Sequence, residues 1–222
     1  AQDYERSRYV TNINKFPEVP SARPATATKL WVSQGYAFIE PDIPIFGEAG
    51  RMNDNYTRDL KENLDAVLDA VVDAGFVDRD KMGLGGHSYG AFMTANLLSH
   101  TQLFAAGIAR SGAYNRTLTP FGFQYEQRSY WEAPEVYFNM SPFSFADQVK
   151  TPILLIHGEA DNNSGTFPIQ SERYYNALKG HGATTRLVLL PHESHGYAAK
   201  ESILHTLWEM DSWLEKYVKN KK

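Results

Sequence analysis

A serine between glycines is the residue of this chain best placed to do chemistry. Ser88 is the centre of the pentad Gly86–Gly90, a G-x-S-x-G pattern that follows an apolar run and precedes a helix-like one. Such a pattern is typical of a sharp strand-to-helix turn that exposes the serine hydroxyl. The flanking glycines let strand and helix approach closely, and the N-terminus of the new helix favours negative charge on an attacked carbonyl. The pentad therefore indicates acyl transfer through a serine nucleophile.

An acid and a base follow later in the chain, each just after a predicted strand. Asp161 follows the apolar run 152–156, and His195 follows the run 186–190. The order Ser, Asp, His is that of the α/β-hydrolase class and differs from the orders of other serine hydrolase folds. Because parallel strands end on one side of a sheet, these residues can converge on Ser88.

The chemistry of acyl transfer assigns a role to each group. A serine hydroxyl is a weak nucleophile, so His195 would accept its proton during attack and later return it to the leaving group. Asp161 would hold the imidazole in the useful tautomer and stabilise the imidazolium. The backbone N–H of Tyr89 would donate to the oxyanion.

Other residues compete for some of these roles. Asp147 also precedes a strand, and Asn162 or Asn163 could orient a histidine in place of Asp161. His192, Glu193 and His195 lie together, but in a loop without the helical H-E-x-x-H frame of zinc hydrolases, so we expect no metal and no cofactor. The other histidines are interpreted as packing, capping or surface residues: His87, His100, His157, His181, His192 and His205.

Strands and helices alternate along the chain, which predicts a mainly parallel α/β sheet with helices on both faces. The predicted strands are 36–40, 82–85, 106–109, 152–156 and 186–190. The predicted helices are 60–72, which ends at Gly75, then 91–98, and 203–214, whose apolar stripe is widened by Leu204 and Trp208.

Composition agrees with one compact domain over residues 1–222. The net charge of −4 gives no basic footprint for nucleic acid, and the terminal lysines are interpreted as a solvated end. Without cysteines the chain has no disulfides and no thiol chemistry. There is no long apolar run and no signal-peptide pattern, so we expect a soluble chain away from membranes, with the compartment open between cytoplasm and periplasm.

Four strings of the chain resemble the catalytic domain of the prolyl oligopeptidase family, and most of all its glutamyl endopeptidase branch. They are residues 85–93, 109–123, 156–163 and 193–197, and the resemblance extends from about Trp31 to the C-terminal helix. It implies a serine peptidase with an α/β-hydrolase fold that cleaves after glutamate in peptides and partly unfolded chains. By the same resemblance Ser88, Asp161 and His195 are the catalytic triad.

The chain also departs from the family pattern. Family members carry an N-terminal β-propeller, then the first strands of the hydrolase sheet and a loop whose tyrosine donates to the oxyanion, and nothing here matches these parts. We expect residues 1–30 to be an irregular lead-in and the chain to be the C-terminal piece of a longer protein. Association with the upstream fragment or propeller would follow, and a plant protein would reside in the plastid stroma. Otherwise the second oxyanion donor is an unrecognised residue.

The segment 112–147 is rich in aromatic side chains and is predicted to form a wall of the substrate pocket. The candidates are Phe121, Phe123, Tyr125 and Trp131. A preference for glutamate needs a cation, and a guanidinium suits a carboxylate because it donates two parallel hydrogen bonds. Arg116 is the first candidate, ahead of Arg110 and Arg128. An esterase or thioesterase on the same fold, or a fragment that is inactive without upstream strands, remains an alternative.

Overall fold

The described residues form a four-stranded parallel sheet in the order β1-β2-β3-β4. The computed structural model describes residues 28–75 and 77–220. The strands are β1 (Gly83–His87), β2 (Ala106–Arg110), β3 (Ile153–Gly158) and β4 (Thr185–Leu190). Every residue of β2 and β3 is buried, as expected of central parallel strands that are covered on both faces. The prediction of a parallel α/β sheet is confirmed.

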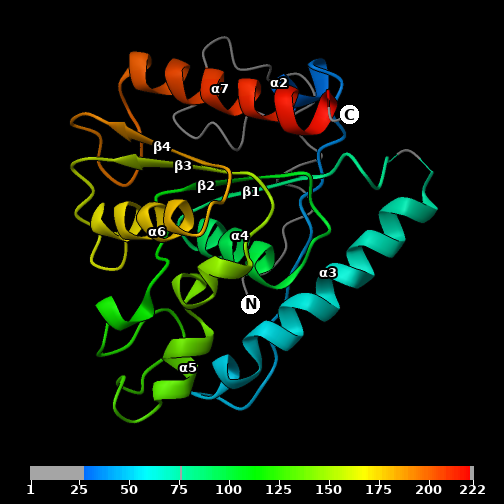
Figure 1. The fold of residues 1–222 in the computed structure, drawn as a ribbon. Helices are drawn as coiled ribbons and strands as arrows, with labels where there is room; N and C mark the ends of the chain where they lie inside the picture. Colours follow the sequence, from blue (N-terminus) through cyan, green and yellow to red (C-terminus); the bar gives the residue numbers. More distant parts are fainter. Residues whose placement is uncertain (1–27, 76, 221–222) are drawn as a thin grey trace.

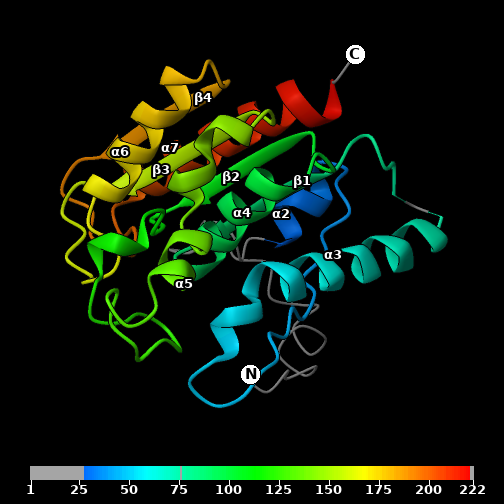
Figure 2. The same cartoon turned by 60° about the horizontal axis from the view of Figure 1, so that its bottom comes forward.

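Helices cover both faces of the sheet (Figures 1 and 2). On one face lie α3 (Tyr56–Asp73), α4 (Tyr89–His100) and α6 (Ile169–Gly180). On the other face lie α2 (Thr28–Ser33) and α7 (Lys200–Leu214), and α7 continues into a π-helical turn at Glu215–Lys219. The segment between β2 and β3 contains α5 (Pro134–Asn139) and two 3₁₀ turns, Arg116–Leu118 and Pro142–Gln148. A further 3₁₀ turn, Met52–Asn55, precedes α3. Each face therefore has its own apolar core.

The helix predictions hold, with one correction. In α3 the buried residues include Leu60, Leu64 and Leu68, and the chain reverses at Gly75, whose φ of +77° suits glycine. In α7 the stripe of Ile203, Leu207 and Met210 is buried as predicted. However, Leu204 and Trp208 are 44% and 59% exposed, so they do not widen it. Both lie on the flank of the helix that turns away from the sheet, which the 3.6-residue period places beyond the buried stripe.

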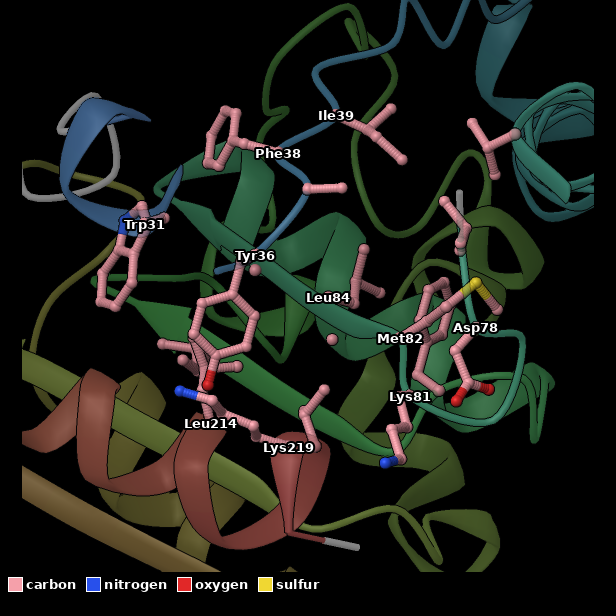
Figure 3. Close-up of a pocket in the computed structure, with 18 of the residues that line it drawn as sticks. Trp31, Tyr36, Phe38, Ile39, Asp78, Lys81, Met82, Leu84, Leu214 and Lys219 are labelled. Carbon is pink, nitrogen blue, oxygen red and sulfur yellow. The ribbon is translucent and has the colours of Figure 1, made fainter. Parts of the chain in front are cut away.

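The predicted strand at 36–40 is wrong, because this segment pairs with no strand. It runs as irregular chain on the far side of a groove from β1, with Phe38 and Ile39 37% and 41% exposed (Figure 3). A strand exists through hydrogen bonds to a neighbour, and here the groove separates the segment from β1. The local apolar pattern could not show that the segment lacks a partner strand.

The predicted irregular lead-in at 1–30 lies mostly outside the described residues. Within its last part the structure shows a helix, since α2 begins at Thr28. Trp31 of this helix is buried against α7 in the second core, which fixes α2 to the α7 face of the sheet.

Candidate active site

Ser88 lies at a sharp turn between β1 and α4. Its φ of 58° and ψ of −116° are outside the regions that side-chain-bearing residues prefer, and this strain is typical of functional positions. Its N–H donates to the Arg110 carbonyl at 2.8 Å, which fixes the turn to β2. A Cβ at Gly86 would overlap the Gly90 backbone, whereas one at Gly90 would meet open space. Close packing therefore requires the first glycine of the pentad and not the second.

Three side chains from distant parts of the sequence form one hydrogen-bonded chain. The hydroxyl of Ser88 lies 2.9 Å from His195 Nε2, and His195 Nδ1 lies 2.8 Å from Asp161 Oδ2. With the proton on Nδ1 donated to Asp161, Nε2 is free to accept the proton of Ser88. This is the relation that a nucleophile, a general base and an orienting carboxylate require.

A close approach between two loops brings His195 to its partners. Asp161 follows β3 in a turn closed by its own N–H donating to the Gly158 carbonyl at 3.1 Å, and the Ala160 N–H donates to the Glu193 carbonyl at 2.8 Å. A Cβ at Gly158 would overlap the carbonyl oxygens of Glu193 and Ser194. Only glycine at this strand end lets the histidine loop lie so close to Asp161.

The Asp161 side chain is fully buried, and it has hydrogen-bond partners in addition to His195. His157 Nε2 lies 3.1 Å from Oδ2, the Asn163 N–H donates to Oδ1 at 3.0 Å, and the Thr166 hydroxyl donates to Oδ2 at 3.2 Å. Burial raises the pKa of Asp161, but the hydrogen bonds from His157, His195 and the Asn163 N–H outweigh it and lower this pKa to about 2. The carboxylate is therefore ionised wherever a histidine can act as a base.

His157, interpreted from the sequence as a packing, capping or surface residue, contacts Asp161 directly. Its ring is buried between Asp161 and Ser171, with Nδ1 2.6 Å from the Ser171 hydroxyl and Nε2 2.7 Å from the Thr166 carbonyl. It contacts the same carboxylate oxygen, Oδ2, as His195 does. Its spacing of four residues from Asp161, across the end of β3, was the one signal available in the sequence.

The Tyr89 N–H, the predicted oxyanion donor, lies at the N-terminus of α4. Tyr89 is the first residue of α4, and its N–H donates to no acceptor among the described residues. The positive end of the helix lies at the same place. A free N–H at a helix N-terminus next to Ser88 is compatible with an oxyanion donor, which stays a prediction.

His87 packs against His195. Its ring centroid lies 5.0 Å from that of His195 and 5.9 Å from that of Tyr197. Burial, followed by the nearby Arg110 charge, lowers the pKa of His87 to about 3. His87 is therefore a neutral ring at neutral pH, and it supports His195 without a competing charge.

Arg116 packs against two aromatic rings, and one of them belongs to α4, the helix that follows Ser88. Its guanidinium carbon is 3.8 Å from the Phe92 ring centroid and 4.5 Å from that of Phe123, and its Nε and Nη2 are buried without a hydrogen-bond partner. Phe92 lies one helical turn after Ser88 and donates its N–H to the Ser88 carbonyl. Burial lowers the pKa of Arg116 to about 10, and the neighbouring Tyr89 opposes the shift, so the side chain keeps its charge at neutral pH.

The other two arginine candidates are placed differently. Arg128 binds Glu126 at 2.8 Å and Asp54 at 2.6 Å, so its charge is already paired. Arg110 is buried at the end of β2 and lines the groove beside β1. Of the three, Arg116 alone has fully buried donor atoms without a hydrogen-bond partner among the described residues.

The aromatic candidates fall into two groups. Phe123 is half-buried and stacks on Arg116, whereas Phe121, Tyr125 and Trp131 are 80%, 58% and 67% exposed. Phe121 and Trp131 contact one another, with ring centroids 5.5 Å apart. The structure therefore places Phe123 against Arg116 and leaves the other three rings at the surface. That these three rings form a wall of the substrate pocket stays a prediction.

The competing residues do not take part in the hydrogen-bonded chain. Asp147 is exposed in the 3₁₀ turn before β3, and the Asn162 side chain accepts from Ser194 at 3.4 Å. Asn163 contacts Asp161 through its backbone. Within residues 28–75 and 77–220, no group of histidine and carboxylate side chains has the arrangement of a metal site. No helix in the part of the chain that the structure describes combines the length and apolarity of a membrane span.

Residues 23–221 match the Prolyl oligopeptidase family. The chain is 60% identical over 196 residues to "Probable glutamyl endopeptidase, chloroplastic" of Arabidopsis thaliana, covering 87% of this chain and 20% of the relative. It is 58% identical over 207 residues to the protein of the same name from Oryza sativa subsp. japonica, covering 92% of this chain and 22% of the relative. The chain thus spans about a fifth of the length of these relatives.

Solved structures share the fold of this chain. The acylaminoacyl peptidase of Pyrococcus horikoshii superposes with a TM-score of 0.65 at 25% identity, covering 77% of this chain and 29% of that one. An acylaminoacyl peptidase in complex with Z-Gly-Gly-Phe-chloromethyl ketone gives a TM-score of 0.67 at 25% identity, covering 80% of this chain and 29% of that one.

Proposed function

This chain belongs to the prolyl oligopeptidase family, and we propose that it is the catalytic part of a serine peptidase that cleaves after glutamate. Its parallel sheet and helices match the α/β-hydrolase fold of the acylaminoacyl peptidase structures. The observation that carries the proposal is the unbroken chain of hydrogen bonds from Ser88 through His195 to Asp161.

The proposed reaction uses each of these groups in turn. His195 Nε2 takes the proton of Ser88 as Oγ bonds to the substrate carbonyl carbon, and the carbonyl oxygen becomes an oxyanion that the Tyr89 N–H binds. His195 then gives the proton to the leaving amine, the C–N bond breaks and an acyl-enzyme remains. A water molecule, deprotonated by the same nitrogen, hydrolyses the ester and regenerates Ser88. Asp161 stabilises the imidazolium throughout.

Arg116 supports the preference for glutamate. Its buried, unpaired donors are costly unless they meet a hydrogen-bonding partner, and a glutamate carboxylate supplies both acceptor atoms and the opposite charge. The rings of Phe92 and Phe123 hold the guanidinium on either side. The names of the two plant relatives agree with this preference.

Fluorophosphonate labelling tests the nucleophile. The probe reacts where a serine is activated and an oxyanion is stabilised, so we expect it to label the chain and to fail on Ser88→Ala. A folded chain that is not labelled would contradict the assembly of the site within these residues and favour the alternative that upstream strands complete it.

Matched substrates test the specificity. Two peptides that differ only by Glu or Gln before the scissile bond are compared with an uncharged activated ester, each with Ser88→Ala as control. Cleavage of the Glu peptide well above the Gln peptide supports the proposal. Turnover of the ester without either peptide would favour an esterase on the same fold.

The names of the plant relatives also support a compartment. Both are described as chloroplastic, and we extend this location to the present protein. Fractionation of plastids, followed by immunodetection with an antibody against this chain, would show the protein in the stroma. Its absence from purified plastids would refute the assignment.

A further inference from the structure

Two buried side chains flank His195 in the loop that joins β4 to α7 (Figure 1). Glu193 precedes the histidine by two residues and is 5% exposed, and Tyr197 follows it by two and is also buried. The rest of the segment 191–199 is exposed, apart from the half-buried His195 itself. Tyr197 is anchored by its hydroxyl, which donates to the Ile156 carbonyl at 3.2 Å. A buried carboxylate in such a surface loop is costly unless its oxygens accept hydrogen bonds, so the partners of Glu193 show what it holds.

The main chain of Glu193 joins the histidine loop to the acid loop. Its carbonyl accepts the Ala160 N–H at 2.8 Å, directly before Asp161, and its own N–H donates to the Leu190 carbonyl at 3.3 Å. The preceding residue, His192, has a φ of 62°, which is uncommon for a residue with a side chain. A tight turn at the end of β4 therefore leads into Glu193.

The side chain of Glu193 reaches across His195 to the start of α7. Its Oε2 accepts the Ala198 N–H at 2.7 Å, and its Oε1 accepts the Ala199 N–H at 2.9 Å. Burial raises the pKa of Glu193, but these two hydrogen bonds outweigh it and lower this pKa, so the carboxylate is ionised at neutral pH. The positive end of α7, which begins directly after Ala199, favours the same charge. The carboxylate thus closes a ring over residues 193–198, and His195 lies within that ring.

We propose that Glu193 is a positioning residue for His195, and that its carboxylate holds the loop in the conformation that places the imidazole between Ser88 and Asp161. This proposal rests on the proposed function, because it gives Glu193 a part in the same reaction. The imidazole must meet two partners at once, at 2.9 Å and 2.8 Å, and a displacement of about 1 Å can cost about a hundredfold in rate.

A simple helix cap would make fewer contacts than Glu193 does. A cap of α7 needs only the two hydrogen bonds to the side chain, whereas the Glu193 carbonyl also fixes the residue before Asp161. One residue therefore ties together the loop of the acid, the loop of the base and the helix that follows. If Glu193 acts as proposed, its loss must be felt at the His195 ring as well as in the stability of α7.

Hydrogen exchange in the unmodified chain tests whether the ring exists in solution. The residues Ala198 and Ala199 are exposed, yet their amides should exchange at least about tenfold more slowly than those of Ser194 and Gly196, which donate to no acceptor among the described residues. Equal exchange rates for the two pairs would overturn the proposal. This measurement needs no variant, so it decides even where a substitution prevents folding.

The substitution Glu193→Gln tests the effect on His195. Glutamine keeps the volume, but its amide nitrogen cannot accept the second N–H. The matched control is Glu209→Gln, which changes a buried carboxylate of α7 that binds Arg186 at 2.8 Å and 2.6 Å. The readout is the far-downfield proton resonance of His195 Nδ1–H on Asp161, identified by its loss in His195→Gln. We expect this resonance to disappear in Glu193→Gln and to remain in Glu209→Gln. Its persistence in both variants, or its absence from the parent chain, would overturn the proposal.

The reaction provides a second readout. Fluorophosphonate labelling should slow at least about tenfold in Glu193→Gln and stay within about twofold in Glu209→Gln, both measured below the melting temperature. In a His195→Gln background, Glu193→Gln should leave the residual hydrolysis of an activated ester within about twofold, because its effect passes through the imidazole. A further large fall there would indicate general loosening of the fold and overturn the proposal. A parent chain that shows the resonance but is not labelled would refute the proposed function and leave the role of Glu193 in place.

Discussion

Replacing Arg116 with methionine should abolish the preference for glutamate while leaving the triad intact. Methionine fills a similar elongated volume between Phe92 and Phe123 but has neither charge nor N–H donors. Removing one partner of a buried, hydrogen-bonded charge pair costs about 2–5 kcal/mol. At about 1.4 kcal/mol per factor of ten, kcat/KM for a Glu peptide should fall by about 30- to 4000-fold.

The same structure predicts no loss of stability. The variant loses contacts of a cation with two rings, worth on the order of 2 kcal/mol in a desolvated site. The substitution also removes an unfavourable contribution, because Nε and Nη2 are buried without partners and each unsatisfied group costs about 1–3 kcal/mol. Relief of about 2–6 kcal/mol for the two groups equals or exceeds the lost ring contacts, so the free energy of unfolding from urea titration should stay level or rise.

The assay compares kcat/KM for matched Glu and Gln peptides, alongside the rate of fluorophosphonate labelling. We expect a large fall for Glu, a change within about threefold for Gln, and an unchanged labelling rate. Equal falls for both peptides, with slower labelling, would mean that Arg116 supports the α4 turn at Ser88 and does not bind substrate. An intact Glu preference would assign the carboxylate to another cation.

Three further perturbations probe the site. Asp161→Asn should lower kcat about 10⁴-fold, as in other serine triads, because the amide stabilises the wrong imidazole tautomer. Turnover of an activated ester measures this loss, and a loss below tenfold would refute the role of the carboxylate. Gly158→Ala should slow fluorophosphonate labelling at least about tenfold, since its Cβ would displace the loop that carries His195; the control Gly165→Ala, whose Cβ meets open space, should label normally. His87→Gln should make the free energy of unfolding depend less on pH in the acid range. The pKa of His87 is about 3 in the folded chain and 6.5 in the unfolded chain, so between these values the unfolded chain binds one more proton. As the pH falls through that window, the parent chain therefore loses up to about 1.4 kcal/mol of stability per pH unit. Urea titrations of both proteins at pH 7 and pH 5 measure this difference, and identical slopes against pH would contradict the assignment.

Local sequence was sufficient for the elements that carry the site. The pentad around Ser88 specifies its own turn, because glycine at position 86 is required where strand and helix nearly touch. Strands β3 and β4 could be recognised because they are continuous apolar runs bounded by polar loops. Asp161 and His195 follow those runs directly, so their convergence at one side of the sheet could be predicted from order alone.

Contacts between distant segments determined the features that the local sequence did not predict. The segment 36–40 has the composition of a strand, yet strand formation depends on a neighbour, and no local pattern reveals whether one is present. The packing of His87 on His195 and the burial of Arg116 against Phe92 each depend on chain brought in from elsewhere in the fold. The amino-acid sequence determined which groups could do chemistry and on which strands they stand. The tertiary structure alone determined which charges are paired, because the free energy of a buried charge is set by whatever surrounds it in space.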